Sequence, residues 1–314
     1  MSAFLEIARL GGFTRASSSM HLSQPTVSRR IQLLERELGA PLFERAHNSV
    51  IVTDAGRAFL PHAEALLASL HDGIDAVAAM RGTAQGAVTL ALVGTLASSI
   101  LTGRLRYFRN AHPGVNLGIL TGLSTEVSAA VRRGDAALGL RYEHDPDPRL
   151  ISSAVYDELM MPVCSPDHHL ARARHVNPER LAGEPWITFP SRPGDAPEPY
   201  RSALERWRAA CGLSSGEIVP IDSLTAQKCM VEAGFGLALL PASSVREELR
   251  SGTLVVLRVA APQATVLVAM VRRAGAFQSG ATQALAAILT AWPQEHRQAL
   301  VSPAQGDRFG PSSR

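Results

Sequence analysis

The sequence predicts an α/β protein in which one long helix joins an N-terminal winged helix-turn-helix to a C-terminal domain of two lobes. Three observations lead to this prediction. Apolar residues recur at helical spacing through residues 1–38, a second helical pattern runs from residue 54 to about 81, and strand-like runs alternate with helical runs from residue 86 onward. A chain of 314 residues is long enough to form two or three such units.

Residues 1–53 make up the predicted winged helix-turn-helix. Three short helices are separated by breaks at residues 11–12 and 21–23, and their apolar faces can share one small core. Gly39 ends the third helix. Two strand-like runs, at 41–43 and 50–52, then predict a wing around a polar turn.

Residues 54–81 form the predicted linker helix, which Thr53 and Asp54 begin with a favourable N-cap and an acidic first turn. Its length is about 40 Å. An apolar stripe follows one face of it, formed by Phe59, Ala63, Leu66, Leu70, Ile74 and Val77. An isolated helix cannot bury such a stripe, so we predict that a partner helix from a second subunit covers it. Packing of the stripe against the same chain is the alternative.

Residues 86–296 form the predicted two-lobed domain, with lobe I at about 86–160 and 265–296 and lobe II at about 161–264. The predicted strands are 87–93, 115–120, 136–140, 157–164, 186–189, 236–240, 254–259 and 265–271, and the predicted helices are 96–110, 124–133, 197–210, 223–233 and 280–292. This alternation favours a mostly parallel sheet. Two crossings between the lobes would leave a cleft, where α/β sheets bind ligands. The tail 302–314, rich in Ser, Pro and Gly, is predicted to be disordered.

The start of the third helix carries the most informative side chains. Ser23 can cap this helix, and Pro25 is tolerated in its first turn. Gln24 with Ser28, and Pro25 with Arg29, are spaced to share one polar face opposite the apolar residues of the helix. In a helix-turn-helix such residues reach base edges in the major groove of DNA. An ordinary solvated helix face is the alternative.

Several runs resemble one known family. They are Gly12-Phe13-Thr14-Arg15-Ala16, Leu22-Ser23-Gln24-Pro25, Ser28-Arg29, Ile31, Leu34-Glu35, Glu37-Leu38-Gly39, Pro41-Leu42-Phe43-Glu44-Arg45 and Thr53-Asp54-Ala55-Gly56. Through them the chain resembles the DNA-binding domain of the LysR-type transcriptional regulators. The remainder is similar to the family's effector domain, which is periplasmic-binding-protein-like, through His168-His169-Leu170-Ala171 and the run 231–241.

The resemblance implies a homodimer or homotetramer that binds double-stranded promoter DNA and responds to a small-molecule effector. RNA polymerase is a further expected partner, and activation and repression both stay open. The residues expected to bind DNA are Ser23, Gln24, Pro25, Thr26, Ser28, Arg29, Arg30 and, on the wing, Arg45. One departure is that family members usually have several more residues before the position of Phe4. Either the start of the chain is misassigned or DNA docking is weakened.

Hydroxyl groups and one arginine mark the expected effector cleft. The candidates are Thr95, Ser124, Thr125, Arg141, Thr188, Ser223 and Thr225. Thr95 and Ser124 follow strands and begin helices, and the backbone N–H groups of helix starts favour anions. Together with the charge of Arg141, they predict a small organic anion, such as a carboxylate, as the effector. For each residue, an ordinary helix cap or surface position is the alternative.

The sequence argues against an enzyme and against a cofactor. It contains no GxSxG elbow, HExxH motif or phosphate-binding GxxxxGK[ST] loop. Gly234-Phe235-Gly236 precedes a strand and lacks a third glycine, which is typical of a tight turn. His168 and His169 with Cys164 raise the alternative of a metal site, but adjacent histidines seldom point at one ion, so a surface turn is favoured.

Charge and cysteine usage fit a cytoplasmic, nucleoid-associated protein. The net charge of +3 mildly favours an anionic partner. A purely architectural DNA-binding protein is disfavoured, because such proteins are small and strongly basic, whereas most of this chain is predicted to form α/β lobes. Three widely spaced cysteines indicate reduced thiols. We expect no secretory signal, because the N-terminus is acidic early, and no membrane span.

Overall fold

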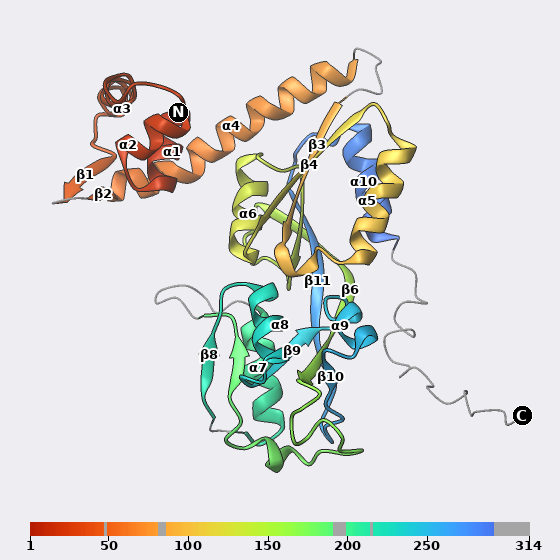
Figure 1. Cartoon of the computed structure of the whole chain (residues 1–314). Helices are drawn as coiled ribbons and strands as arrows, with labels where there is room; N and C mark the ends of the chain where they lie inside the picture. The colour runs from red at the N-terminus through yellow and green to blue at the C-terminus, as the bar shows by residue number, and fades with distance from the viewer. Residues whose placement is uncertain (47–48, 81–85, 191–198, 214–215, 292–314) are drawn as a thin grey trace, which may run out of the picture.

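The computed structural model describes residues 1–46, 49–80, 86–190, 199–213 and 216–291. Its N-terminal unit is three helices and a two-stranded wing (Figure 1). These elements are α1 (Ser2–Leu10), α2 (Phe13–Ser19), α3 (Gln24–Leu38), β1 (Phe43–Ala46) and β2 (Ser49–Val52). The expected winged helix-turn-helix is therefore confirmed, with helix breaks where Gly11 and Gly39 adopt left-handed conformations.

Apolar side chains from all three helices bury one small core. Phe4, Ile7, Ala16, Val27 and Ile31 are each at most 3% exposed. The wing strands are antiparallel and pair Phe43 with Val52, so the ring of Phe43 packs on that of Phe4 at 5.3 Å between centroids. This core fixes α3 with its opposite face turned to solvent.

The linker helix α4 (Asp54–Met80) leaves the wing and runs along lobe I (Figure 1). Thr53 caps it, since the Gly56 N–H donates to Thr53 Oγ1 at 3.0 Å. The predicted apolar stripe divides into two parts. Ala63 is fully buried in the N-terminal core, where Phe59 also packs. The other four residues stay 55–58% exposed: Leu66, Leu70, Ile74 and Val77.

One mixed sheet runs through both lobes, in the order β4-β3-β5-β11-β6-β9-β7-β8 with β10 paired to β6. The strands are β3 (Gly86–Val93), β4 (Val115–Gly122), β5 (Leu138–Tyr142), β6 (Leu150–Cys164), β7 (Trp186–Thr188), β8 (Ile218–Pro220), β9 (Leu237–Pro241), β10 (Val255–Val256) and β11 (Ala264–Arg273). Pairing within each lobe is parallel for β3 with β4 and β5, and for β7 with β8 and β9. The prediction of a mostly parallel sheet is wrong for β6 and β11, which pair antiparallel with their neighbours.

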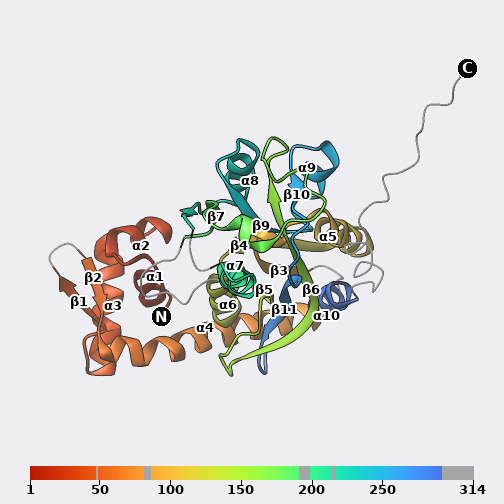
Figure 2. The ribbon, with the colours of Figure 1, turned by 90° about the horizontal axis from the view of Figure 1, so that it is seen from below.

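Helices cover this sheet in both lobes (Figures 1 and 2). They are α5 (Ser99–Ala111), α6 (Ser124–Arg133), α7 (Pro199–Ala210), α8 (Leu224–Glu232), α9 (Arg246–Ser251) and α10 (Gly280–Thr290), with short 3-10 turns at Gly94–Leu96 and Pro178–Leu181. Lobe I contains α5, α6 and α10, and lobe II contains α7, α8 and α9. Among the described helices, none combines the length and the apolar character that a membrane crossing needs.

The strands β6 and β11 cross between the lobes side by side, and they pair over nearly their whole lengths, from Leu150 with Arg273 to Met160 with Ala264. The pairing shifts register between Val268 and Ala269, which marks a bulge within lobe I, where β11 also pairs with β5. The lobes therefore meet at a two-stranded hinge. The predicted segments 292–296 and 302–314 and residue 81 lie outside the described residues.

Candidate functional site

The polar face of α3 lies on the surface of the N-terminal unit, with most of its side chains exposed. Ser23 accepts a hydrogen bond from the Thr26 N–H at 3.4 Å, and Pro25 occupies the first turn, as the sequence indicates. Gln24 and Arg29 are exposed, and so are most of the other residues expected to bind DNA on this helix: Ser23, Pro25, Thr26 and Arg30. Ser28 is half-buried.

The side chains on this face are of the kinds that contact base edges in double-stranded DNA. Val27 and Ile31, on the opposite side, are 0% and 3% exposed, so the helix cannot rotate without exposing apolar surface. Amide, hydroxyl and guanidinium groups are thus held outward at the helix start, where a major groove would receive them. Arg45 lies on the wing strand β1, paired with Val50.

A cleft of about 510 Å³ lies between the lobes. Its lobe I wall comes from the turn before α5, and its lobe II wall comes from the start of α8 and the segment that leads into α9. The lining residues are Gly94, Thr95, Ala97, Ser98, Leu224, Thr225, Lys228, Ser243, Ser244, Arg246, Glu247 and Glu248. Of the predicted effector residues, the cleft brings together Thr95 and Thr225.

The two helix starts at this cleft leave backbone donors available. Helix α5 begins at Ser99 rather than at residue 96, because Thr95 lies in a separate 3-10 turn and Ala97 has a non-helical conformation. Ser98, the N-cap of α5, makes no capping bond with its own side chain. Thr225 lies in the first turn of α8, which Ser223 caps through a 3.4 Å bond from the Ala226 N–H. Two helix N-termini therefore face one cleft.

The remaining predicted effector residues lie outside this lining. Ser124 is fully buried at the start of α6, and Thr125 beside it is exposed. Thr188, at the end of β7, is 1% exposed, and its Oγ1 has no hydrogen-bond partner among the described residues. Arg141 lies within β5 rather than after it, and its charge is balanced by the buried carboxylate of Asp145.

Cations that the sequence analysis did not select are present at the cleft. Lys228 donates to the Ser244 carbonyl at 3.2 Å and pairs with Glu248. Arg246 is exposed and, within the described part of the chain, forms no ion pair. Lys228 is the only lysine in the chain. This isolated occurrence is the one feature of the sequence that could have marked Lys228 as a candidate site residue.

A buried polar cluster connects the cleft to the hinge. Thr95 Oγ1 and the Tyr142 hydroxyl lie 2.9 Å apart. Glu158, on the crossing strand β6, is fully buried and accepts a hydrogen bond from the Ser243 N–H at 3.1 Å. Burial raises the pKa of the Glu158 carboxyl, against the opposing effect of the Ser243 hydrogen bonds. Ser243 and Thr95, which line the cleft, therefore contact Glu158 on the hinge strand β6 and Tyr142 beside the hinge. A ligand that moves either residue would act directly on the hinge.

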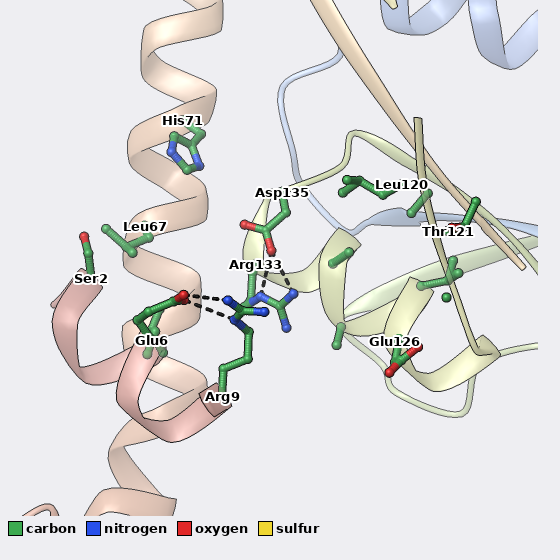
Figure 3. Close-up of a pocket in the computed structure, with 16 residues that line it drawn as sticks. Ser2, Glu6, Arg9, Leu67, His71, Leu120, Thr121, Glu126, Arg133 and Asp135 are labelled. Atoms are coloured by element: carbon green, nitrogen blue, oxygen red, sulfur yellow. Dashed lines mark hydrogen bonds and ion pairs between the residues drawn. The ribbon is translucent and has the colours of Figure 1, made fainter. Parts of the chain in front are cut away.

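A second cavity, of about 690 Å³, lies between α1 and α4 on one side and β4 and α6 on the other (Figure 3). Arg9 pairs with Glu6 across one turn of α1, and Arg133 pairs with Asp135 beyond α6. Arg133 also helps to lower the pKa of Glu6, after the larger effect of the hydrogen bond from Arg9. The winged helix-turn-helix and lobe I therefore face each other with complementary charges.

These features define a class of protein: a helix-turn-helix with an outward polar recognition face, attached to a two-lobed domain with an interlobe cleft. Two family models match the chain in that arrangement. The bacterial regulatory helix-turn-helix protein, lysR family, matches residues 1–57, and the LysR substrate binding domain matches residues 81–294. The chain therefore belongs to the LysR family of DNA-binding transcriptional regulators.

Individual relatives agree with this assignment. The chain is 27% identical over 259 residues to the RuBisCO operon transcriptional regulator of Allochromatium vinosum, covering 82% of this chain and 84% of the relative. It is 28% identical over 244 residues to a probable cat1 operon transcriptional activator of Acinetobacter lwoffii, covering 77% and 79%.

Solved structures show the same fold. A full-length OxyR variant from Pseudomonas aeruginosa aligns with a TM-score of 0.64 at 20% identity, covering 92% of this chain and 93% of that one. CbnR, a LysR family transcriptional regulator, aligns with a TM-score of 0.62 at 21% identity, covering 91% and 96%.

Proposed function

We propose that this regulator senses a small organic anion in the interlobe cleft and reads promoter DNA with the exposed face of α3. The observation that carries the first part is the lining of the cleft, where two helix N-termini meet the side chains of Lys228 and Arg246. Backbone N–H groups and cations both favour an anion, and a carboxylate can accept from several donors at once.

The charge balance of the cleft supports the choice of an anion. Glu248 neutralises Lys228, and Glu247 pairs with Arg250, which does not line the cleft. Arg246 forms no ion pair among the described residues, so its charge can pair with a ligand, although it also acts on the buried carboxyl of Glu158. Thr95 and Thr225 add hydroxyl donors from opposite walls, so a carboxylate that contacts both would draw the lobes together.

DNA reading is proposed for the predicted residues of α3, with the wing residue Arg45 on the backbone or in the minor groove. The support is their exposure on one face of a helix whose other face is locked in the core. Gln suits adenine, and Arg suits guanine or phosphate. We further propose that the chain acts by binding rather than by catalysis, and that it works in the cytoplasm at the nucleoid.

Assembly is proposed to use the exposed part of the α4 stripe. Leu66, Leu70, Ile74 and Val77 form a row at four- and three-residue spacing, while Ala68, off this row, is buried near Gly134 of lobe I. One face of α4 thus packs against lobe I of its own chain, and the other face is exposed. A second copy of α4 can cover the open row, which gives a homodimer or, with further contacts, a homotetramer.

The effector proposal is tested by a thermal-shift screen of small mono- and dicarboxylates, followed by calorimetry with the compound that raises the melting temperature most. Thr95→Val keeps the shape but removes a donor, and Arg246→Ala removes the available charge. Each is expected to weaken binding of that compound by about 1–3 kcal/mol. Arg258→Ala, at an exposed position of lobe II outside the lining, is the matched control. Unchanged affinities in both cleft variants would place the ligand elsewhere.

A further inference from the structure

A cluster of two histidines and one glutamate lies in lobe II, away from the cleft. His168 and His169 follow the end of β6, and Glu184 precedes β7. One potential ligand atom from each of the three side chains lies within 4.8 Å of the others. Although adjacent histidines usually diverge, these two rings lie 4.5 Å apart between centroids, with planes inclined by 33°.

The backbone holds the two histidines on one side of a tight turn. The His168 N–H donates to the Ser165 carbonyl at 3.1 Å, and the Ala171 N–H donates to the His168 carbonyl at 2.9 Å. Leu170, fully buried, anchors the turn in the core of the lobe. On the other segment, the Glu184 N–H donates to the Leu181 carbonyl at 3.2 Å. The cluster is thus built from two fixed segments.

The distances from each histidine to the Glu184 carboxylate are close to those between neighbouring ligands of a tetrahedral ion. His168 Nε2 lies 3.3 Å from Glu184 Oε2, and His169 Nε2 lies 3.5 Å from Glu184 Oε1. Metal bonds of about 2.0–2.1 Å place neighbouring ligands of a tetrahedron about 3.3 Å apart. Because the two contacts end on different oxygens of Glu184, the side chains rotate on binding to bring one centre within reach of all three.

Charge and exposure also suit a divalent cation. Two neutral imidazoles and one carboxylate carry a net charge of −1, and within the described residues the ion pairs of Glu184 are with these two histidines. His168 and Glu184 are 12% and 18% exposed, whereas His169 is 61% exposed. His168 and Glu184 therefore form the buried side of the site. The side next to His169 is open to solvent, where water can complete the coordination.

We propose that His168, His169 and Glu184 form a binding site for a transition-metal dication of the Zn²⁺ type. Nitrogen ligands disfavour Mg²⁺ and Ca²⁺, whereas two histidines and a carboxylate are a common Zn²⁺ set. The ion links the turn after β6 to the segment before β7 and so braces lobe II. Cys164 is fully buried and takes no part in the cluster.

Binding changes the tautomer of one ring. The Leu170 N–H points at His168 Nδ1 at 3.3 Å, so in the metal-free protein Nε2 carries the proton and donates to Glu184. When the ion occupies Nε2, the proton moves to Nδ1 and this long contact from Leu170 is lost.

The test is calorimetry with ZnCl₂ on the full chain, without a polyhistidine tag and after treatment with chelator. One Zn²⁺ per chain is expected, with affinity reduced at least tenfold in His169→Ala and in Glu184→Gln. His169 is mostly exposed and Gln has the shape of Glu, so both variants should fold. His175→Ala and Glu179→Gln, at exposed positions nearby, are the matched controls and should bind like the wild type.

Cobalt gives a second readout at the same site. Co²⁺ bound by this set should show visible absorption bands that Zn²⁺ displaces and that an excess of Mg²⁺ leaves unchanged. The bands should be lost in His169→Ala and kept in His175→Ala. The proposal is overturned if the wild type takes up no Zn²⁺, or if the cluster variants and the control variants bind it equally.

Discussion

The guanidinium of Arg273 donates two parallel hydrogen bonds to the carboxylate of Asp72, from Nη1 to Oδ2 at 2.9 Å and from Nη2 to Oδ1 at 2.8 Å. Arg273 ends β11, and Asp72 lies on α4. Glu64, about two turns earlier on α4, lies 3.8 Å from Arg149, which directly precedes β6. Both crossing strands are therefore fastened to the linker helix.

Removing the Asp72 to Arg273 pair should loosen α4 from lobe I. The two side chains are 22% and 18% exposed, so solvent screens the pair only partly. A double-mutant cycle with Asp72→Asn and Arg273→Gln should give a coupling energy of about 1–2 kcal/mol in denaturant unfolding. Hydrogen exchange of α4 should also accelerate in each single variant. The exposed Asp54 to Arg57 pair on the same helix is the control, and should show no measurable coupling.

Replacing Leu70 by Glu should dissociate the assembly. Leu70 is the most exposed member of the open row on α4, and a charge at that position would have to be buried without a partner in a dimer. Light scattering should show a shift toward monomer at concentrations where the wild type is dimeric. Ser69→Glu, exposed on the same turn but off the row, should leave the assembly intact. A Leu70→Glu protein with the wild-type mass would show that another surface holds the subunits together.

Glu158 should make stability depend on pH. Because its pKa is raised in the folded state, the folded chain binds a proton more tightly than the unfolded chain. Its contribution is therefore fully present below the ordinary carboxyl pKa of 4.5 and is lost as pH rises through the raised value. Glu158→Gln, which keeps an acceptor for the Ser243 N–H, should melt above the wild type at pH 8 and equally at pH 4.

The control for this titration is the exposed Glu217→Gln. It should shift the melting temperature little at either pH, because its carboxyl is already solvated. If Glu158→Gln instead lowers the melting temperature at pH 8, the carboxylate is ionised in the fold and makes favourable contacts there.

Arg29→Ala should weaken DNA binding and relax its specificity. A duplex selected by the wild type from a random-sequence pool provides the probe. If Arg29 reads a base, the variant should lose about 1–3 kcal/mol of binding free energy and show reduced preference at one base pair. If Arg29 contacts a phosphate, the slope of log K against log salt concentration should instead fall in magnitude by about one. Arg36→Ala, exposed in the last turn of α3, is the matched control. Footprints unaltered by both Arg29→Ala and Gln24→Ala would remove the assigned face from the interface.

Local sequence signals predicted the N-terminal unit well, because two of its three helices end at glycines and the third helix begins at a serine cap. Gly11 and Gly39 adopt the left-handed conformations that end α1 and α3, and Ser23 caps the start of α3. In contrast, β6 begins at Leu150 although the sequence predicts a start near Asp157. Residues 151–154 are polar or exposed, and pairing with β11 rather than apolar periodicity makes them a strand.

The cleft was only partly predictable for a similar reason. Thr95 could be placed because a hydroxyl after a buried strand is a local pattern. The ion pair that neutralises Arg141 depends on how the loop after β5 folds back to bring Asp145 to it. Lys228 and Arg246 meet the cleft only through the packing of α8 and α9, and α9 itself is short and polar. Such contacts between distant segments leave no periodic mark in the sequence.

The continuous sheet also sets what the two lobes can do as mechanical parts. Since β6 and β11 belong to both lobes and hydrogen-bond to each other through the crossing, the lobes can approach or separate only by bending or twisting this shared pair of strands. The bulge beside Ala269, where β11 also pairs with β5 of lobe I, is the irregular point of this pair of strands. Neither lobe is therefore a separable module: a chain shortened to lobe I would leave half of each shared strand without neighbours, exposing edges prone to aggregation.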